Sequence, residues 1–333
     1  MEYRVLGASG MRVSVMCLGT AFYGSLTPVG ASIRLVHHGF DRGINFIDTA
    51  NTYGDRRFSY PGVSPERPMV EEIVGQALRG RRDSVVLATK CGEPVGDGPT
   101  DRGLARRHIL RQVEISLKRL ETDYIDLYYP HHPDPLTPID QTLRAFDDLV
   151  RQGKVRSIGL SDYRGWQVVE ALWAAERHLT ATPVCVQTLY NLLDRRDEQE
   201  LMPACRRFGL STVAFSPMAG GLLSGQYRPH HDPPEGSRGS VTRAEHGRPS
   251  AIPLLVEPYL SASQRLVDIA HAHGRTASQV ALAWILAHPE VASVITGVEH
   301  SAELDENMEA ADMHLTSEEC AALEAATMSS DER

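Results

Sequence analysis

Short apolar runs of strand length alternate along the chain with longer stretches of helical apolar periodicity. The strand-like runs span 15–19, 45–48, 84–89, 124–129, 155–160, 184–187, 211–215 and 292–295. The helical patterns span 31–42, 66–79, 106–120, 138–152, 165–178, 198–208 and 301–311. Strands that alternate with helices pair in parallel through crossovers, so an α/β fold is predicted. Eight near-equal units favour a closed (β/α)8 TIM barrel over the alternative, a doubly wound open sheet.

Glycines and capping sequences mark the expected helix ends. Four glycines each follow a helical pattern and precede a strand-like run, as expected for a left-handed residue just beyond a helix. They are Gly43, Gly80, Gly153 and Gly209. Capping boxes at 276–279 and 316–319 predict extra C-terminal helices, one at 277–287 and one ending near 326.

Two segments fall outside the alternating pattern. The pattern of residues 3–14 predicts a β-hairpin with its turn at 7–10. We expect this hairpin to plug the N-terminal end of the barrel. Residues 226–259 are rich in Pro, Gly, His, Ser and Arg and lack periodicity. We expect this long loop to lie over the barrel mouth, either as a lid or as a disordered segment. The whole chain, 1–333, is expected to form a single barrel domain.

Composition narrows the classes of function. The net charge is −9 and no Lys/Arg-rich block occurs, so a nucleic-acid partner is not expected. No apolar run reaches the length of a membrane span, and the start, MEYR, lacks the pattern of a signal peptide. The 5 cysteines contain no C-x-x-C pair, which is typical of reduced thiols. A cytoplasmic protein without a membrane partner is therefore expected.

Ionisable residues stand at the ends of three consecutive strand-like runs. Asp48 ends one run, Lys90 follows the next, His131 follows the third, and Tyr53 lies shortly after Asp48. In a parallel barrel these strand ends meet at one mouth, where active sites lie. A lysine beside a phenol favours the phenolate, which makes the tyrosine a better proton donor to a developing alkoxide. Each residue alone is equally consistent with a structural role, but the four together indicate proton transfer.

Longer motifs around these residues resemble the aldo-keto reductase family along nearly the whole chain. The shared pieces are LGT at 18–20, DTANTYG at 48–54, ATK at 88–90, LYYPHHPD at 127–134, GKVRSIGLSD at 153–162, QTLYN at 187–191, FSPMAGGLLSG at 215–225 and EN at 306–307. The opening RVLGASG is similar to the branch that includes bacterial reductases and relatives of potassium-channel β-subunits.

The resemblance implies reduction of an aldehyde or ketone with NAD(P)H, or the reverse oxidation of an alcohol or sugar. Tyr53 would be the general acid, and Lys90, paired with Asp48, would lower its pKa. His131 would orient the carbonyl of a small-molecule substrate. The expected substrate-lining residues are Phe22, Tyr23, Tyr53 and His131.

The resemblance also implies that a nicotinamide cofactor binds across the barrel mouth. Ser161 and Gln187 would hold the carboxamide, and Phe215 would stack on the nicotinamide ring. The implied cofactor contacts are Gly19, Thr20, Asp48, Ser161, Asp162, Gln187, Phe215, Ser216, Pro217, Met218, Gly220, Leu222, Gly297, Glu299, Glu303, Glu306 and Asn307. No G-x-G-x-x-G follows a strand, so a Rossmann site is not encoded.

Several positions depart from the family pattern. Asp162 stands where the family usually has Asn. Gly297, Glu299 and Glu303 stand where relatives that prefer NADPH often carry Lys, Arg, Ser or Gln. A carboxylate repels a 2′-phosphate but can accept a hydrogen bond from a ribose 2′-OH. The cofactor is therefore expected to be NADPH or NADH, with NADH used at least comparably. The alternative is that Glu299 points to solvent and that His300 or a distant Arg binds the phosphate.

Two other functions compete with the reductase. A lysine on a barrel strand could form a Schiff base, but Asp48 favours its charged, non-nucleophilic form. A cofactor-binding regulatory subunit with slow turnover would keep the same fold. No metal site is predicted, because the one suitable pattern, His131-His132-Pro-Asp134, is better explained by the reductase role.

Overall fold

The computed structural model describes residues 1–55, 66–228, 231–235, 237, 239–240 and 256–327. Parallel strands form its centre in the order β7-β6-β5-β4-β3-β11-β10-β9-β8. Their bounds are β3 Met16–Gly19, β4 Phe46–Asp48, β5 Val86–Cys91, β6 Ile125–Pro130, β7 Val155–Ile158, β8 Leu160–Ser161, β9 Cys185–Leu189, β10 Ser211–Phe215 and β11 Val291–Thr296.

The two ends of this strand order are one segment of chain, and this closes the sheet into a (β/α)8 barrel. Only Gly159 separates β7 from β8. Its N–H donates to the Tyr128 carbonyl on one side (3.1 Å), and Val184 N–H donates to the Ile158 carbonyl on the other (2.9 Å). A side chain at position 159 would meet the Tyr129 ring at 2.3 Å, so the close approach of the strands requires glycine. The predicted fold class is confirmed.

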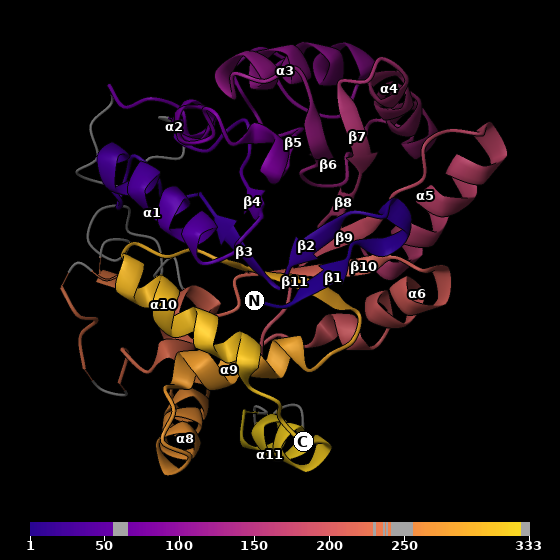
Figure 1. Ribbon diagram of the computed structural model, residues 1–333. Helices are drawn as coiled ribbons and strands as arrows, with labels where there is room; N and C mark the ends of the chain where they lie inside the picture. Colours follow the sequence, from indigo (N-terminus) through magenta and orange to yellow (C-terminus); the bar gives the residue numbers. More distant parts are fainter. Residues whose placement is uncertain (56–65, 229–230, 236, 238, 241–255, 328–333) are drawn as a thin grey trace.

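Helices surround the barrel (Figure 1). They are α1 Val29–Asp41, α2 Val70–Ala77, α3 Arg106–Arg119, α4 Ile139–Arg151, α5 Gly165–His178, α6 Leu201–Phe208, α8 Tyr259–Ala272, α9 Ala277–Leu286, α10 Ser301–Glu309 and α11 Ser317–Thr327. Their apolar faces form one core cluster against the outer faces of the strands, and a second cluster fills the barrel interior. The four expected helix-end glycines all have positive φ.

The N-terminal hairpin plugs the barrel as expected. Strands β1 (Tyr3–Val5) and β2 (Arg12–Ser14) pair antiparallel and lie across the strands in Figure 1. Leu6 and Val13 are buried in the interior cluster. Gly7 N–H donates to Ser211 Oγ at the first residue of β10 (2.8 Å), which places the hairpin at the N-terminal end of the barrel.

Three helices differ from the sequence-based expectation. Helix α2 begins at Val70 rather than 66, and Glu72 caps this end by accepting from Met69 N–H (2.8 Å). Helix α6 begins at Leu201 rather than 198, because residues Arg196–Glu198 form a 3-10 turn. Helix α8 was not predicted as a separate element. Both predicted capping boxes form, at the starts of α9 and α11.

Much of the expected loop 226–259 lies outside the described residues, namely 229–230, 236, 238 and 241–255. Of its described residues, four line the cavity considered below: Gln226, Pro234, Glu235 and Ser237. Among the described residues, no helix is both long and apolar enough to cross a bilayer.

Candidate active site

The four predicted catalytic side chains meet at the C-terminal end of the barrel. Asp48 is the last residue of β4 and Lys90 lies in β5; both are buried. The Lys90 ammonium donates to Asp48 Oδ1, to the Thr49 carbonyl (2.9 Å) and to Tyr53 Oη (3.3 Å). All three ammonium donors are therefore used, and one is aimed at the phenol.

Charge and burial set the protonation states of this cluster. Burial opposes the charge of Lys90, but Asp48 and Tyr53 outweigh it, so the pKa of Lys90 is raised and it stays an ammonium. Burial also raises the pKa of Tyr53, and the nearby Lys90 only partly opposes this. The net shift of Tyr53 is thus opposite to the expected lowering. Lys90 alone would lower the pKa of Tyr53, but the cost of desolvating a buried phenolate outweighs that effect.

His131 directly follows β6 and lies beside Tyr53, with ring centroids 6.0 Å apart. Its backbone N–H donates to the Cys91 carbonyl (2.7 Å), which ties it to the end of β5. Burial, together with the charges of Lys90 and His132, holds the pKa of His131 well below its usual range. Its Nδ1 is buried without a protein hydrogen-bond partner. A neutral imidazole carries one N–H donor, which suits it to a carbonyl oxygen.

His132 makes an ionic contact on each of its ring nitrogens. Nε2 lies 2.6 Å from Glu93 Oε1, and Nδ1 lies 3.0 Å from Asp162 Oδ2. Hydrogen bonds to Asp162 and Glu93 raise the pKa of His132 to about 9. Its ring stacks on His131 at 4.8 Å with 7° between the planes.

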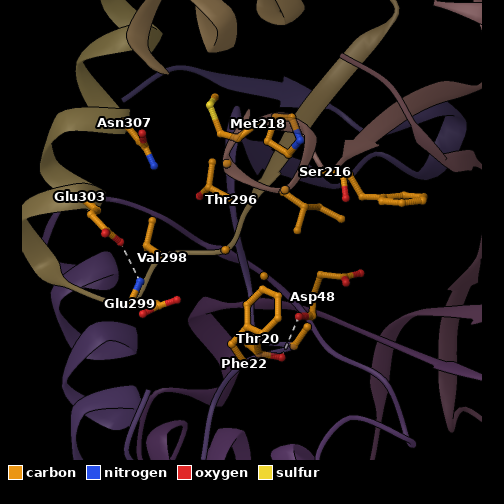
Figure 2. A pocket seen from close by; sticks show the side chains of 18 of the residues that line it. Thr20, Phe22, Asp48, Ser216, Met218, Thr296, Val298, Glu299, Glu303 and Asn307 are labelled. Atoms are coloured by element: carbon orange, nitrogen blue, oxygen red, sulfur yellow. Dashed lines mark hydrogen bonds between the residues drawn. The ribbon is translucent and has the colours of Figure 1, made fainter. Parts of the chain in front are cut away.

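A cavity of about 790 Å³ opens above these residues. Nearly all of the expected cofactor contacts line it: Gly19, Thr20, Asp48, Ser161, Asp162, Gln187, Phe215, Ser216, Pro217, Met218, Gly220, Gly297, Glu299, Glu303, Glu306 and Asn307. Phe22, Tyr53 and His131 also line it. Figure 2 shows Asp48 at one side of the pocket and Glu299, Glu303 and Asn307 at the other. The cavity thus extends from Asp48, Tyr53 and His131 to the start of α10.

Two expected residues do not reach the cavity. Tyr23 is 1% exposed and belongs to the core between helices and strands, whereas its neighbour Phe22 lines the cavity. Leu222 is likewise buried in that core, because it lies in a 3-10 segment whose Gly220 and Gly221 have positive φ. Tyr23 is therefore a packing residue, and Gly220 and Gly221, rather than Leu222, present backbone to the cavity.

The amide of Gln187 is already engaged by the buried Asp48–Lys90 pair. Its Nε2 donates to Asp48 Oδ2 (2.7 Å), so Asp48 accepts from both Gln187 and Lys90. The carboxylate is thereby fixed on both oxygens. Gln187 Oε1 is left as an acceptor at the cavity wall.

Among the described residues, one group offers ligand atoms at metal-binding spacing. Single atoms of Glu93, His131 and His132 lie within 4.8 Å of one another. However, the contacts of His132 with Glu93 and Asp162 use both of its ring nitrogens as N–H donors, so it has no lone pair for a metal. We assign no metal ligands here.

The comparison with known proteins agrees with this geometry. The sequence model described as the Aldo/keto reductase family matches residues 15–327. The chain belongs to the aldo/keto reductase family. Family membership supports NAD(P)H-dependent carbonyl reduction in general.

Named relatives cover almost the full length of this reductase. It is 39% identical over 325 residues to the uncharacterized oxidoreductase YrpG of Bacillus subtilis (96% of this chain, 93% of that protein). It is 35% identical over 318 residues to a probable voltage-gated potassium channel subunit beta of Arabidopsis thaliana (94% and 92%). It is 31% identical over 319 residues to the L-glyceraldehyde 3-phosphate reductase of Escherichia coli K12 (93% and 87%).

Some lining residues of this aldo/keto reductase were missed by sequence reasoning. His132 stands in the quoted HHPD motif, but its role depends on Glu93 and Asp162, which come from other loops. The adjacent pair of histidines and the unusual Asp162 were the available signals. Glu235 and Ser237 lie in the aperiodic segment, where no pattern distinguishes lining residues from others.

Proposed function

We propose that this protein reduces an aldehyde or ketone with Tyr53 as the general acid. The observation that carries the proposal is the 3.3 Å contact between the Lys90 ammonium and Tyr53 Oη at the floor of the cavity. The raised pKa of Tyr53 keeps the phenol protonated at neutral pH, so it has a proton to give. The ammonium then stabilises the phenolate that remains.

The lining residues fit a nicotinamide dinucleotide. When bound, this cofactor supplies the hydride. Gln187 Oε1 and Ser161 offer polar atoms beside the proton-transfer cluster, and Phe215 offers an aromatic face at the end of β10. Gly220 and Gly221 offer backbone that a phosphate can approach closely.

The neutral state of His131 suits it to orient the substrate oxygen. A neutral imidazole N–H donates to a carbonyl without protonating it, so the proton is left to Tyr53. The edge-on arrangement of the two rings supports a shared target oxygen. Phe22 would supply an apolar wall for the substrate.

We further propose that NADH is used at least as well as NADPH. Glu299, Glu303 and Glu306 line the far end of the cavity, and none of its described lining residues is Lys or Arg. Glu303 Oε2 accepts from Glu299 N–H (2.9 Å), which holds two carboxylates close together at the start of α10. Their charges disfavour the 2′-phosphate that distinguishes NADPH.

The alternatives are less well supported. A Schiff-base lysine must lose its proton, whereas the Asp48 ion pair raises the pKa of Lys90. A slow regulatory subunit remains compatible with the fold, but the complete cluster of Asp48, Tyr53, Lys90 and His131 supports turnover.

A panel of aldehydes and ketones tests the proposal, with oxidation of NADH and NADPH followed at saturating carbonyl. We expect turnover with at least one carbonyl, and a fall of about 10²–10⁴-fold in kcat for Tyr53→Phe, the usual contribution of a general acid. Cofactor binding to Tyr53→Phe should be retained, as measured by fluorescence titration. Full activity of Tyr53→Phe would overturn the mechanism.

A further inference from the structure

The Glu93–His132–Asp162 cluster has no part in the proton transfer proposed above, yet it lies at the wall of the same cavity. Its three residues come from the loops after β5, β6 and β8, so the cluster ties three strand ends together. His132 and Asp162 both line the cavity.

Asp162 places a negative charge where the reaction is sensitive to it. Its carboxylate contributes to raising the pKa of Tyr53. During carbonyl reduction, negative charge develops on the substrate oxygen beside Tyr53, and a nearby carboxylate opposes that development. Asp162 is also fixed in place: its φ is +58° and its N–H donates to the Gln187 carbonyl (3.0 Å). The backbone that carries the Asp162 carboxylate is therefore held at the cavity wall.

We propose that His132 is a positioning residue, a cation held between Glu93 and Asp162 that neutralises Asp162 at the cavity wall and holds His131 in its carbonyl-orienting state. The inference rests on the proposed reductase function. Among the described residues, His132 is the only cationic side chain within ion-pair distance of Asp162; Arg196 lies near enough for both Asp194 and Asp162 to raise its pKa, but it forms its ion pair with Asp194. It acts through Tyr53 and His131 rather than on the substrate itself.

The geometry supports a His132 that is protonated at neutral pH. A ring with a carboxylate oxygen at each nitrogen donates from both, and only the imidazolium carries two N–H groups. The third neighbouring titratable group, His131, stacks face to face with it and stays neutral beside this charge. His132 is thus the charged ring of the pair, and His131 is the neutral hydrogen-bond donor.

A purely structural role explains the cluster less well. The His132 side chain is 46% exposed, and ion pairs at such sites contribute little to folding stability. Their effect on charge inside an adjoining cavity is larger, because the low-dielectric walls of a cavity strengthen the interaction. The main effect of His132 should therefore appear in catalysis.

A double-mutant cycle tests the inference through kcat for carbonyl reduction. We expect His132→Gln to lower kcat by about 10-fold in the wild-type background. In the Asp162→Asn background the same change should cost less than about 3-fold, because the carboxylate at the cavity wall is gone and only Glu93, which does not line the cavity, still pairs with His132. A loss from His132→Gln that is equal in both backgrounds would refute charge compensation. His38→Gln is the matched control, because His38 pairs with Asp305 in a similar exposed contact (2.9 Å) outside the cavity lining.

A second measurement needs no turnover. The imidazole resonance of His132, assigned by its loss in His132→Gln, should titrate near pH 9, whereas titration near the ordinary value of ~6.5 would overturn the inference. Tyr53→Phe is assayed in parallel. If Tyr53→Phe retains activity, the reductase mechanism fails. If Tyr53→Phe is inactive but His132→Gln matches the wild type, only the role of His132 fails.

Discussion

The carboxylates at the start of α10 should discriminate against NADPH, and replacing them should remove that discrimination. Glu299 is half-buried and Glu303 is exposed; Glu303 accepts from the Glu299 backbone N–H. Glutamine at both positions keeps the size, and its carbonyl oxygen can still accept that hydrogen bond. The double variant Glu299→Gln/Glu303→Gln therefore removes two charges while preserving the helix start.

The size of the effect follows from Coulomb's law. Two unit charges in contact at 4 Å repel by about 1 kcal/mol in water and about 4 kcal/mol at an effective dielectric of 20. Because Glu303 is exposed and Glu299 is only half-buried, we use the lower value for both as a minimum, which is roughly 5-fold in affinity for each carboxylate. For both carboxylates we expect KM for NADPH to fall about 30-fold. KM for NADH should change by less than about 3-fold, because NADH carries no 2′-phosphate and each glutamine keeps an oxygen that can accept from the ribose, at the cost of a charged acceptor becoming a neutral one.

The assay measures kcat/KM for both cofactors at one saturating carbonyl concentration, in low and in moderate salt. Screening at moderate salt should shrink the discrimination in the wild type. Glu309→Gln is the control, because Glu309 lies on the same helix but does not line the cavity. A wild-type enzyme that strongly prefers NADPH would refute the reasoning, as would an unchanged ratio in the double variant.

Three further predictions concern folding and the site's charges. Lys90→Met should destabilise the fold by about 3–5 kcal/mol in chemical denaturation and abolish most activity, because it leaves the Asp48 carboxylate buried and unpaired. An unfolding midpoint equal to the wild type would contradict this. The raised pKa of His132 means that its stabilisation is fully present below pH ~6.5 and is lost as the pH rises through about 9. The difference in Tm between wild type and His132→Gln should therefore shrink from pH 6 to pH 10. A difference that grows with pH would contradict a raised pKa of His132. Gly159→Ala should cost about 1–3 kcal/mol, since its methyl group would overlap the Tyr129 ring, and a neutral effect in denaturation would exclude that clash.

The barrel and the position of the proton-transfer cluster could be predicted because both depend on local order along the chain. A run of apolar residues fixes a strand, and the polar residue that ends the run must emerge at the mouth when all strands are parallel. Asp48, Lys90 and His131 follow this rule directly. The helix-end glycines follow a similarly local rule, since few other residues adopt positive φ without strain.

The features of the site that the sequence did not predict depend on packing between distant segments. Whether Phe22 or Tyr23 faces the cavity is decided by the turn after β3, which the sequence pattern does not specify. The net pKa shift of Tyr53 depends on how completely the neighbouring loops bury it. The pairing of His132 with Glu93 and Asp162 joins residues about 40 and 30 positions apart, so no short motif contains it.

The pairing of β3 with β11 has a consequence for biosynthesis. The first and last strands of the barrel are direct neighbours, with Met16 opposite Val294 and Leu18 opposite Thr296. While the ribosome is still translating the later units, β3 therefore presents a free, apolar edge to the cell, the kind of surface at which chains aggregate. The barrel can close only when residues near 296 have left the exit tunnel and β11 can pair with β3. A prematurely terminated chain that lacks β11 would thus be prone to intermolecular strand pairing rather than to partial function.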